Sequence, residues 1–205
     1  MMEIKKEKLL MYALPLVVLL AFLLLSPGFG LRSVNRAFAL SAVVVLGITF
    51  IIGPLSKFIK AVNRGKLYRR YLGLAGVAIF MVHIAISFVF YYSSDIFALL
   101  DFGNPRMLQV YAGLIALIIF FLMVITSAKQ IIRVLGGKNW KLIQNTGYIA
   151  MILVMLHFML ANTSRGDFNI DRIYALAAFA FGIIIILARI FVLILVQIEK
   201  SSRKK

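Results

Sequence analysis

Two apolar stretches decide the fold of this chain: YLGLAGVAIFMVHIAISFVFYY (71–92) and WKLIQNTGYIAMILVMLHFMLA (140–161). Each is long enough to cross a bilayer as a helix, and each carries one of the two histidines in the sequence, His83 and His157. Hydrocarbon offers an imidazole no partner, so an ionisable side chain at this depth indicates a functional site. Two imidazoles on facing helices are what a six-coordinate haem iron requires as axial ligands.

A simpler interpretation of the two histidines stays open at this point. A neutral imidazole can hydrogen-bond to a hydroxyl or a carbonyl group of a neighbouring helix and serve packing alone. Under that interpretation the chain is a haem-free membrane scaffold, or a small transporter whose histidines relay protons. Transporters usually carry polar or acidic residues at mid-membrane, whereas the acidic residues here lie in the tails and loops.

The rest of the sequence repeats the apolar pattern. The chain has 205 residues, of which 63% are hydrophobic, and a mean hydropathy of +1.01, values that predict a multi-pass membrane protein. We expect an all-α bundle of six transmembrane helices, forming a single domain over residues 1–205. The six expected spans are 9–26, 37–54, 71–92, 107–127, 142–161 and 173–196, with Pro15 a kink in the first and Gly136-Gly137 a helix stop before the fifth.

The distribution of charge orients the expected bundle. Of the 23 basic residues, 17 fall in the two tails and in the loops that share their side of the membrane, around residues 57–70 and 129–141. The opposite side holds five, together with four of the seven acidic residues: Arg32, Arg36, Arg106, Arg165 and Arg172, with Asp95, Asp101, Asp167 and Asp171. Basic loops stay in the cytoplasm, so both termini are predicted to be cytoplasmic.

Composition excludes several classes of protein and cofactor. The net charge of +16 is spread over short segments between apolar runs, a pattern that indicates contact with anionic lipid or an acidic redox partner and not nucleic acid. Because the chain has no cysteine, thiolate-bound haem, covalently attached haem and iron–sulfur clusters are excluded. No glycine-rich nucleotide-binding motif occurs, so an oxidoreductase built on this chain would be one subunit of a system and not a complete reductase.

Several motifs resemble those of a known family. LYRRYLGL (67–74), followed by His83, is similar to the start of the haem-bearing third helix of ferric-reductase-like transmembrane domains. The stretch from Thr126 to His157, with Gly137-Lys138, Trp140 and Tyr148, resembles the haem-binding membrane subunit of the bacterial periplasmic methionine sulfoxide reductase system. A weaker similarity covers NRAFAL and IGPL between residues 35 and 55.

The resemblance implies a haem b inside the bundle, ligated by His83 and His157, in a protein of the inner (plasma) membrane. Electrons would come from a quinol or a flavin reductase and leave to an outer acceptor: a periplasmic or membrane redox partner, ferric iron or oxygen. Gln144 departs from the family, which typically has another histidine there, so we expect one haem per chain. Arg69 and Arg70 are candidate contacts for FMN or a quinone, although a solvated basic cluster explains them as well.

Overall fold

The computed structural model describes residues 2–26, 28, 30–97, 103, 106–164, 167–168, 170 and 172–202. The described chain is almost entirely helical. Its main helices are α1 (Met2–Leu25), α2 (Leu31–Leu55), α3 (Arg69–Tyr92), α5 (Met107–Thr126), α6 (Lys129–Asn145), α7 (Gly147–Ala161) and α8 (Ile173–Ser202). The short elements are a 3₁₀ helix, η1 (Lys60–Leu67), and the antiparallel pair β1 (Thr163–Ser164) and β2 (Asp167–Phe168). Asp101, Asp171, Arg165 and Arg203 to Lys205 lie outside the described residues.

Five helical segments are long and apolar enough to cross a membrane: 31–55, 69–92, 107–126, 129–161 and 173–202. The apolar part of α1, Leu9–Leu25, is shorter, and Pro15 lies inside it. Five of the six expected spans therefore lie in helical segments long enough to cross a membrane, and the first lies in a shorter apolar helix. The backbone of Gly136 has φ 72° and ψ 156°, which breaks α6 into two parts at the predicted glycine pair. Only a residue without a Cβ adopts this conformation readily.

The second helix begins earlier than the sequence indicated. We expected a loop up to about residue 36, yet α2 starts at Leu31, so Arg32, Asn35 and Arg36 lie in its first two turns. The turn residues Ser26 to Gly30 precede the helix, and nothing after Gly30 interrupts it. Polar side chains in the first turn of a helix cost little free energy where the helix leaves the membrane. Here they line the site described below.

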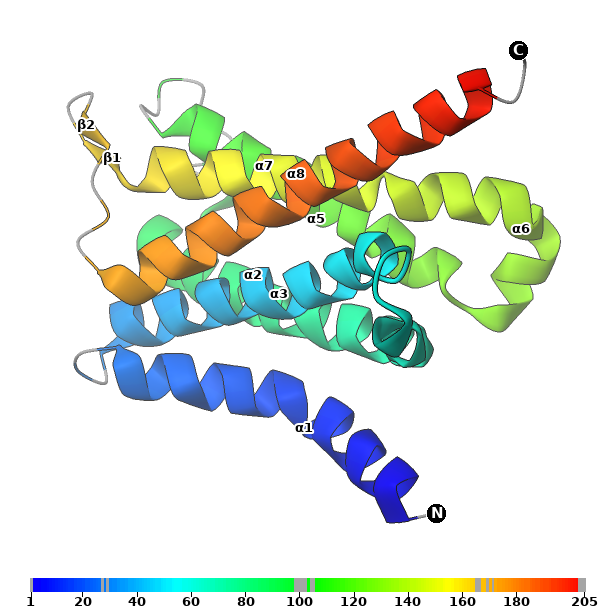
Figure 1. Ribbon diagram of the computed structural model, residues 1–205. Coiled ribbons are helices and arrows are strands. Elements are labelled where there is room, and N and C mark those ends of the chain that lie inside the picture. Colours follow the sequence, from blue (N-terminus) through cyan, green and yellow to red (C-terminus); the bar gives the residue numbers. More distant parts are fainter. Residues whose placement is uncertain are drawn as a thin grey trace.

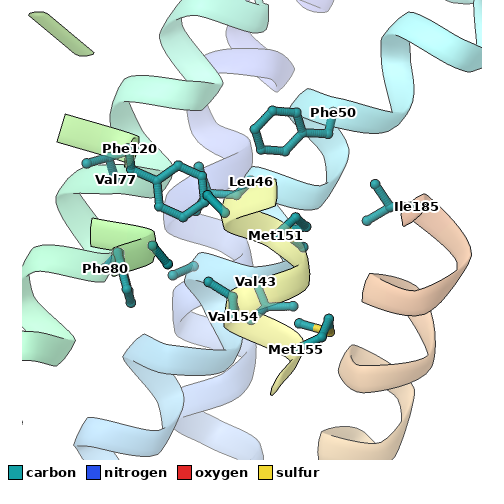
Figure 2. Close-up of a cluster of buried hydrophobic side chains, with 13 residues drawn as sticks. Val43, Leu46, Phe50, Val77, Phe80, Phe120, Met151, Val154, Met155 and Ile185 are labelled. Atoms are coloured by element: carbon teal, nitrogen blue, oxygen red, sulfur yellow. The ribbon is translucent and has the colours of Figure 1, made fainter. Parts of the chain in front are cut away.

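The helices form a bundle around α2, which has the largest set of buried residues (Figure 1). The most extensive helix contacts are between α2 and α3 and between α5 and α7. The start of α1, the end of α8 and the bend within α6 lie at one end of the bundle, and β1–β2 lies at the other. The main core joins side chains of α2, α3, α5, α7 and α8 (Figure 2), including Phe50, Phe80, Phe120, Met151 and Ile185.

Candidate functional site

The structure brings the two histidines together. His83 comes from α3 and His157 from α7, and the centres of their imidazole rings are 6.3 Å apart, with the ring planes at 84°. Both rings line one cavity of about 520 Å³, which is bounded by α2, α3, α5, α7 and the start of α8. That volume lies within the usual range for pockets that hold small molecules or cofactors.

Each imidazole is held by its Nδ1 atom. Nδ1 of His157 lies 2.8 Å from the backbone oxygen of Gln109. Nδ1 of His83 lies 2.8 Å from Oδ1 of Asn35 and 3.2 Å from the backbone oxygen of the same residue. A carbonyl oxygen only accepts hydrogen bonds, so the partners assign the hydrogen to Nδ1 in both rings. Nε2 of each ring is then the nitrogen with a lone pair, which is the arrangement found in metal-ligating histidines.

Two further residues fix the ring positions. Asn35 is buried, and its Nδ2 donates to Oγ of Ser87 at 2.9 Å, so its Oδ1 is left to face His83. Gly113 of α5 provides the space for the other ring: a Cβ atom at this position would lie 2.9 Å from Nδ1 of His157. Sequence reasoning missed Asn35 and Gly113, because neither residue type signals its partner before α2 packs on α3 and α5 packs on α7.

Four arginines also line the cavity. They are Arg32 and Arg36 from the first turns of α2, Arg106 at the start of α5, and Arg172 immediately before α8. Nη1 of Arg172 donates to the Tyr174 hydroxyl at 2.7 Å. The sequence assigned these residues to the sparsely charged outer side and gave them no role. The sequence did contain one indication of a role for them: every basic residue assigned to that side is an arginine.

Arg69 and Arg70 lie at the opposite end of α3 from the cavity. Nε of Arg69 donates to the backbone oxygen of Thr49 at 3.0 Å, and Arg70 is exposed. Thirteen residues of helix separate Arg70 from His83, a rise of about 20 Å. The structure therefore keeps these two arginines apart from the histidines.

Arg189 is the one basic residue that the charge count assigned to neither side of the membrane. It lies within α8, where its guanidinium is 4.7 Å from the centre of the Tyr148 ring and donates to Oδ1 of Asn145 at 3.2 Å.

A chain of aromatic rings fills the bundle between Tyr148 and the cavity. Consecutive ring centres are 5.1 Å apart for Tyr148 and Phe50, 6.3 Å for Phe50 and Phe120, 5.9 Å for Phe120 and Phe80, and 6.2 Å for Phe80 and His83. The three phenylalanines are buried. Closely packed rings of this kind fill the core along this line.

The residues around the cavity fit a haem. Two imidazoles whose ring centres lie 6.3 Å apart, each with its Nδ1 on a carbonyl oxygen, would be able to hold the iron of a haem. Within the described part of the chain, no group of three or more His, Cys, Asp or Glu side chains gathers to bind a bare metal ion. A haem needs only the two axial ligands, because its macrocycle supplies the others.

Comparison with known proteins adds an independent observation. The sequence model of the family described as "ferric reductase like transmembrane component" matches residues 9–155, more than half of the chain. The chain belongs to this family. The family is one of transmembrane components, and five of the described helical segments are long and apolar enough to cross a membrane, so this chain is a multi-pass membrane protein. The match includes His83 and ends two residues before His157. The closer resemblance to the methionine sulfoxide reductase subunit stays a prediction.

A curated relative also matches in part. The chain is similar to the magnetosome protein MamZ of Paramagnetospirillum magneticum, with 28% identity over 137 residues. The alignment covers 65% of this chain but only 21% of MamZ, so the chain spans about a fifth of that relative's length.

Proposed function

We propose that this chain is a haem b-containing electron-transfer subunit of the membrane, with His83 and His157 as the axial ligands. One observation carries the proposal. Two imidazoles from different helices lie 6.3 Å apart in one cavity, and each is held by an Nδ1 contact to a carbonyl oxygen. These contacts leave both Nε2 atoms available to one metal ion. Membership of the ferric reductase-like family supports a role in membrane electron transfer for the chain.

The protein groups would set the properties of the cofactor. A bound haem b supplies one-electron chemistry, and two axial imidazoles leave no open position for oxygen, which favours electron transfer. Carbonyl acceptors at Nδ1 increase the basicity of the imidazoles, and the apolar core next to Phe80 keeps water from that side of the cavity. Arginines at the outer side of the cavity match the charge of the two haem propionates.

The proposal includes a direction across the inner membrane. Six spans with cytoplasmic termini put the cavity in the outer half of the bundle. A quinol, or a flavin reductase on the basic cytoplasmic side near Arg69 and Arg70, would donate the electrons. The acceptor would be an outer-side oxidoreductase, ferric iron or oxygen.

The decisive experiment is an absorption spectrum of the purified chain, with a haem assay. We expect a low-spin b-type spectrum whose bands shift on reduction with dithionite. His83→Ala and His157→Ala should each remove most of the bound haem, because either change empties an axial position. Met159→Ala is the matched control: Met159 lies two residues from His157 on α7 and is 39% exposed. A haem-free wild-type protein would instead favour the scaffold or transporter hypothesis.

A further inference from the structure

Part of the cavity wall belongs to the outer surface of the bundle. Exposed apolar side chains recur along α3 every three or four residues and so lie on one face of the helix: Leu74, Ala78, Met81, Ala85 and Val89. In a multi-pass membrane protein, an exposed apolar face of a spanning helix contacts lipid. Two of these residues, Met81 and Ala85, also line the histidine cavity. The cavity therefore reaches the lipid-facing side of α3.

Met81 and Ala85 lie deeper in the bundle than the other exposed residues of the cavity wall. Those others are at the outer ends of their helices: Arg32, Tyr91, Arg106 and Ala161. Met81 is eleven residues from the end of α3, a rise of about 16 Å. Met81 and Ala85 are each two residues from His83 along the helix. This part of the cavity thus lies at the depth of the imidazole, within the hydrocarbon layer.

Helix α5 forms the other side of this passage. Val110 and Leu114 of α5 line the cavity and are half-buried. Leu114 is seven residues after the start of α5, and Ala85 is seven residues before the end of α3, so each lies about 10 Å from the outer end of its helix. The packing of α3 on α5 is far less extensive than that of α3 on α2. We call the gap bounded by Met81, Ala85, Val110 and Leu114 the lateral opening.

An aromatic contact closes the lateral opening on its inner side. The rings of Phe80 on α3 and Phe120 on α5 meet edge to face, with their centres 5.9 Å apart. Phe80 lines the cavity, and both rings are buried in the main core. The lateral opening therefore leads from the bilayer into the outer half of the bundle only.

From this geometry we infer that a lipid-soluble quinone enters the cavity from the bilayer through the lateral opening. A quinone joins an uncharged aromatic head group to an apolar tail, so it moves freely in hydrocarbon. All four side chains that bound the lateral opening are apolar, and the small side chain of Ala85 leaves space between the helices. Aromatic rings suited to a flat head group line the cavity behind it: Phe80, Phe88, Tyr91, Tyr92 and Phe158.

This inference deepens the proposed function and rests on it for the role of the quinone. The proposed function leaves two classes of donor, a quinol and a flavin reductase. The lateral opening favours the quinol, because it joins the bilayer to the histidine cavity without passage through the inner half of the bundle. Binding needs no electron transfer, so it can be measured whether or not the protein contains haem.

The test is photolabelling of the full-length protein with an azidoquinone that carries an isoprenoid tail. The protein is held in nanodiscs of phosphatidylcholine, its haem content is measured separately, and the labelled peptides are identified by mass spectrometry. We expect label on α3 between Phe80 and Tyr92 and on the first two turns of α5. Ala85→Trp should reduce this labelling severalfold, because the indole fills the gap. Leu114→Trp closes the same gap from α5 and should have the same effect.

Ala78→Trp is the matched control. Ala78 lies on the same exposed face of α3, two helical turns from Ala85, but it does not line the cavity. The same substitution there should leave the labelling unchanged. An unlabelled quinone with a tail should compete with the probe, and the same head group without a tail should compete much less.

Each other outcome is decisive. Equal losses in Ala78→Trp, label confined to other helices, or equal competition by the tail-less head group would overturn the inference. A photoreactive phospholipid that labels the same residues and is not displaced by quinone would identify a lipid chain as the occupant and also overturn it. Haem-free protein with labelling intact would refute the proposed function and leave the quinone site standing. Haem-containing protein without label at the lateral opening would do the reverse.

Discussion

Gly113 and His157 fit against each other across the interface of α5 and α7. A Cβ atom at position 113 would lie 2.9 Å from Nδ1 of His157, which is closer than real Cβ contacts come. The same Nδ1 atom donates to the backbone oxygen of Gln109, one turn earlier on α5. The absence of a side chain at Gly113 is therefore what lets the imidazole approach the helix backbone and keep its hydrogen bond.

Substitution of Gly113 should displace the imidazole without removing it. In Gly113→Ala the ring must move off α5, so we expect the hydrogen bond to Gln109 to weaken and the haem content to fall severalfold. Gly73→Ala is the control, since a Cβ there would make only an ordinary 3.5 Å contact with Thr49. Pyridine haemochrome assays and low-spin spectra of both variants measure the difference. Equal haem content in the two would show that the ring position does not depend on Gly113.

Asn35 should tune the haem site through His83. Asn35→Leu removes the Oδ1 acceptor at 2.8 Å and leaves only the backbone oxygen at 3.2 Å. Loss of an acceptor of this kind typically lowers metal affinity by about 10 to 100-fold. The imidazole also becomes a weaker donor to ferric iron, so the midpoint potential should rise. Ser41→Ala, which removes a hydrogen bond within α2, should change neither the haem affinity nor the potential in a redox titration.

The haem content should be one per chain. Gln144 lies thirteen residues before His157, and its amide donates towards the backbone oxygen of Met123 and Oγ1 of Thr126. Three residues further along the chain, Phe50 packs against Gly147. We expect a haem-to-protein ratio near one by pyridine haemochrome and amino-acid analysis. The ratio should stay near one in Gln144→His, because the aromatic core still fills the inner half. A ratio near two in the unmodified protein would contradict this prediction.

Both termini should face the cytoplasm. The starting point of α1 and the end of α8 lie at the same end of the bundle as η1 and α6 (Figure 1), where the basic residues concentrate. A fluorescent protein that folds only in the cytoplasm, fused after Lys205, should be active, and alkaline phosphatase at the same site should be inactive. Insertion of the same two reporters after Ser94 should give the opposite pattern. Reversed activities would place the histidine cavity in the cytoplasmic half of the bundle.

Much of the helical plan could be predicted from the sequence, because apolar runs and basic loops respond directly to the bilayer. The start of α2 could not, since its first two turns contain Arg32, Asn35 and Arg36 and have no apolar periodicity. The histidines were found by depth and residue type alone. Their partners Asn35, Gln109 and Gly113 depend on which helices pack together, and that is decided by the fit of many small contacts.

The pairing of helices has a consequence for how the protein would assemble. His83 of α3 is hydrogen-bonded to Asn35 of α2, and His157 of α7 is hydrogen-bonded to Gln109 of α5. These are also the two pairs of helices with the most extensive contacts. Each helix pair thus carries one imidazole that is already oriented, and the two pairs face each other across the cavity. A cofactor bonded to both imidazoles would link the two helix pairs. Its loss should therefore weaken the packing between the pairs before the packing within each pair.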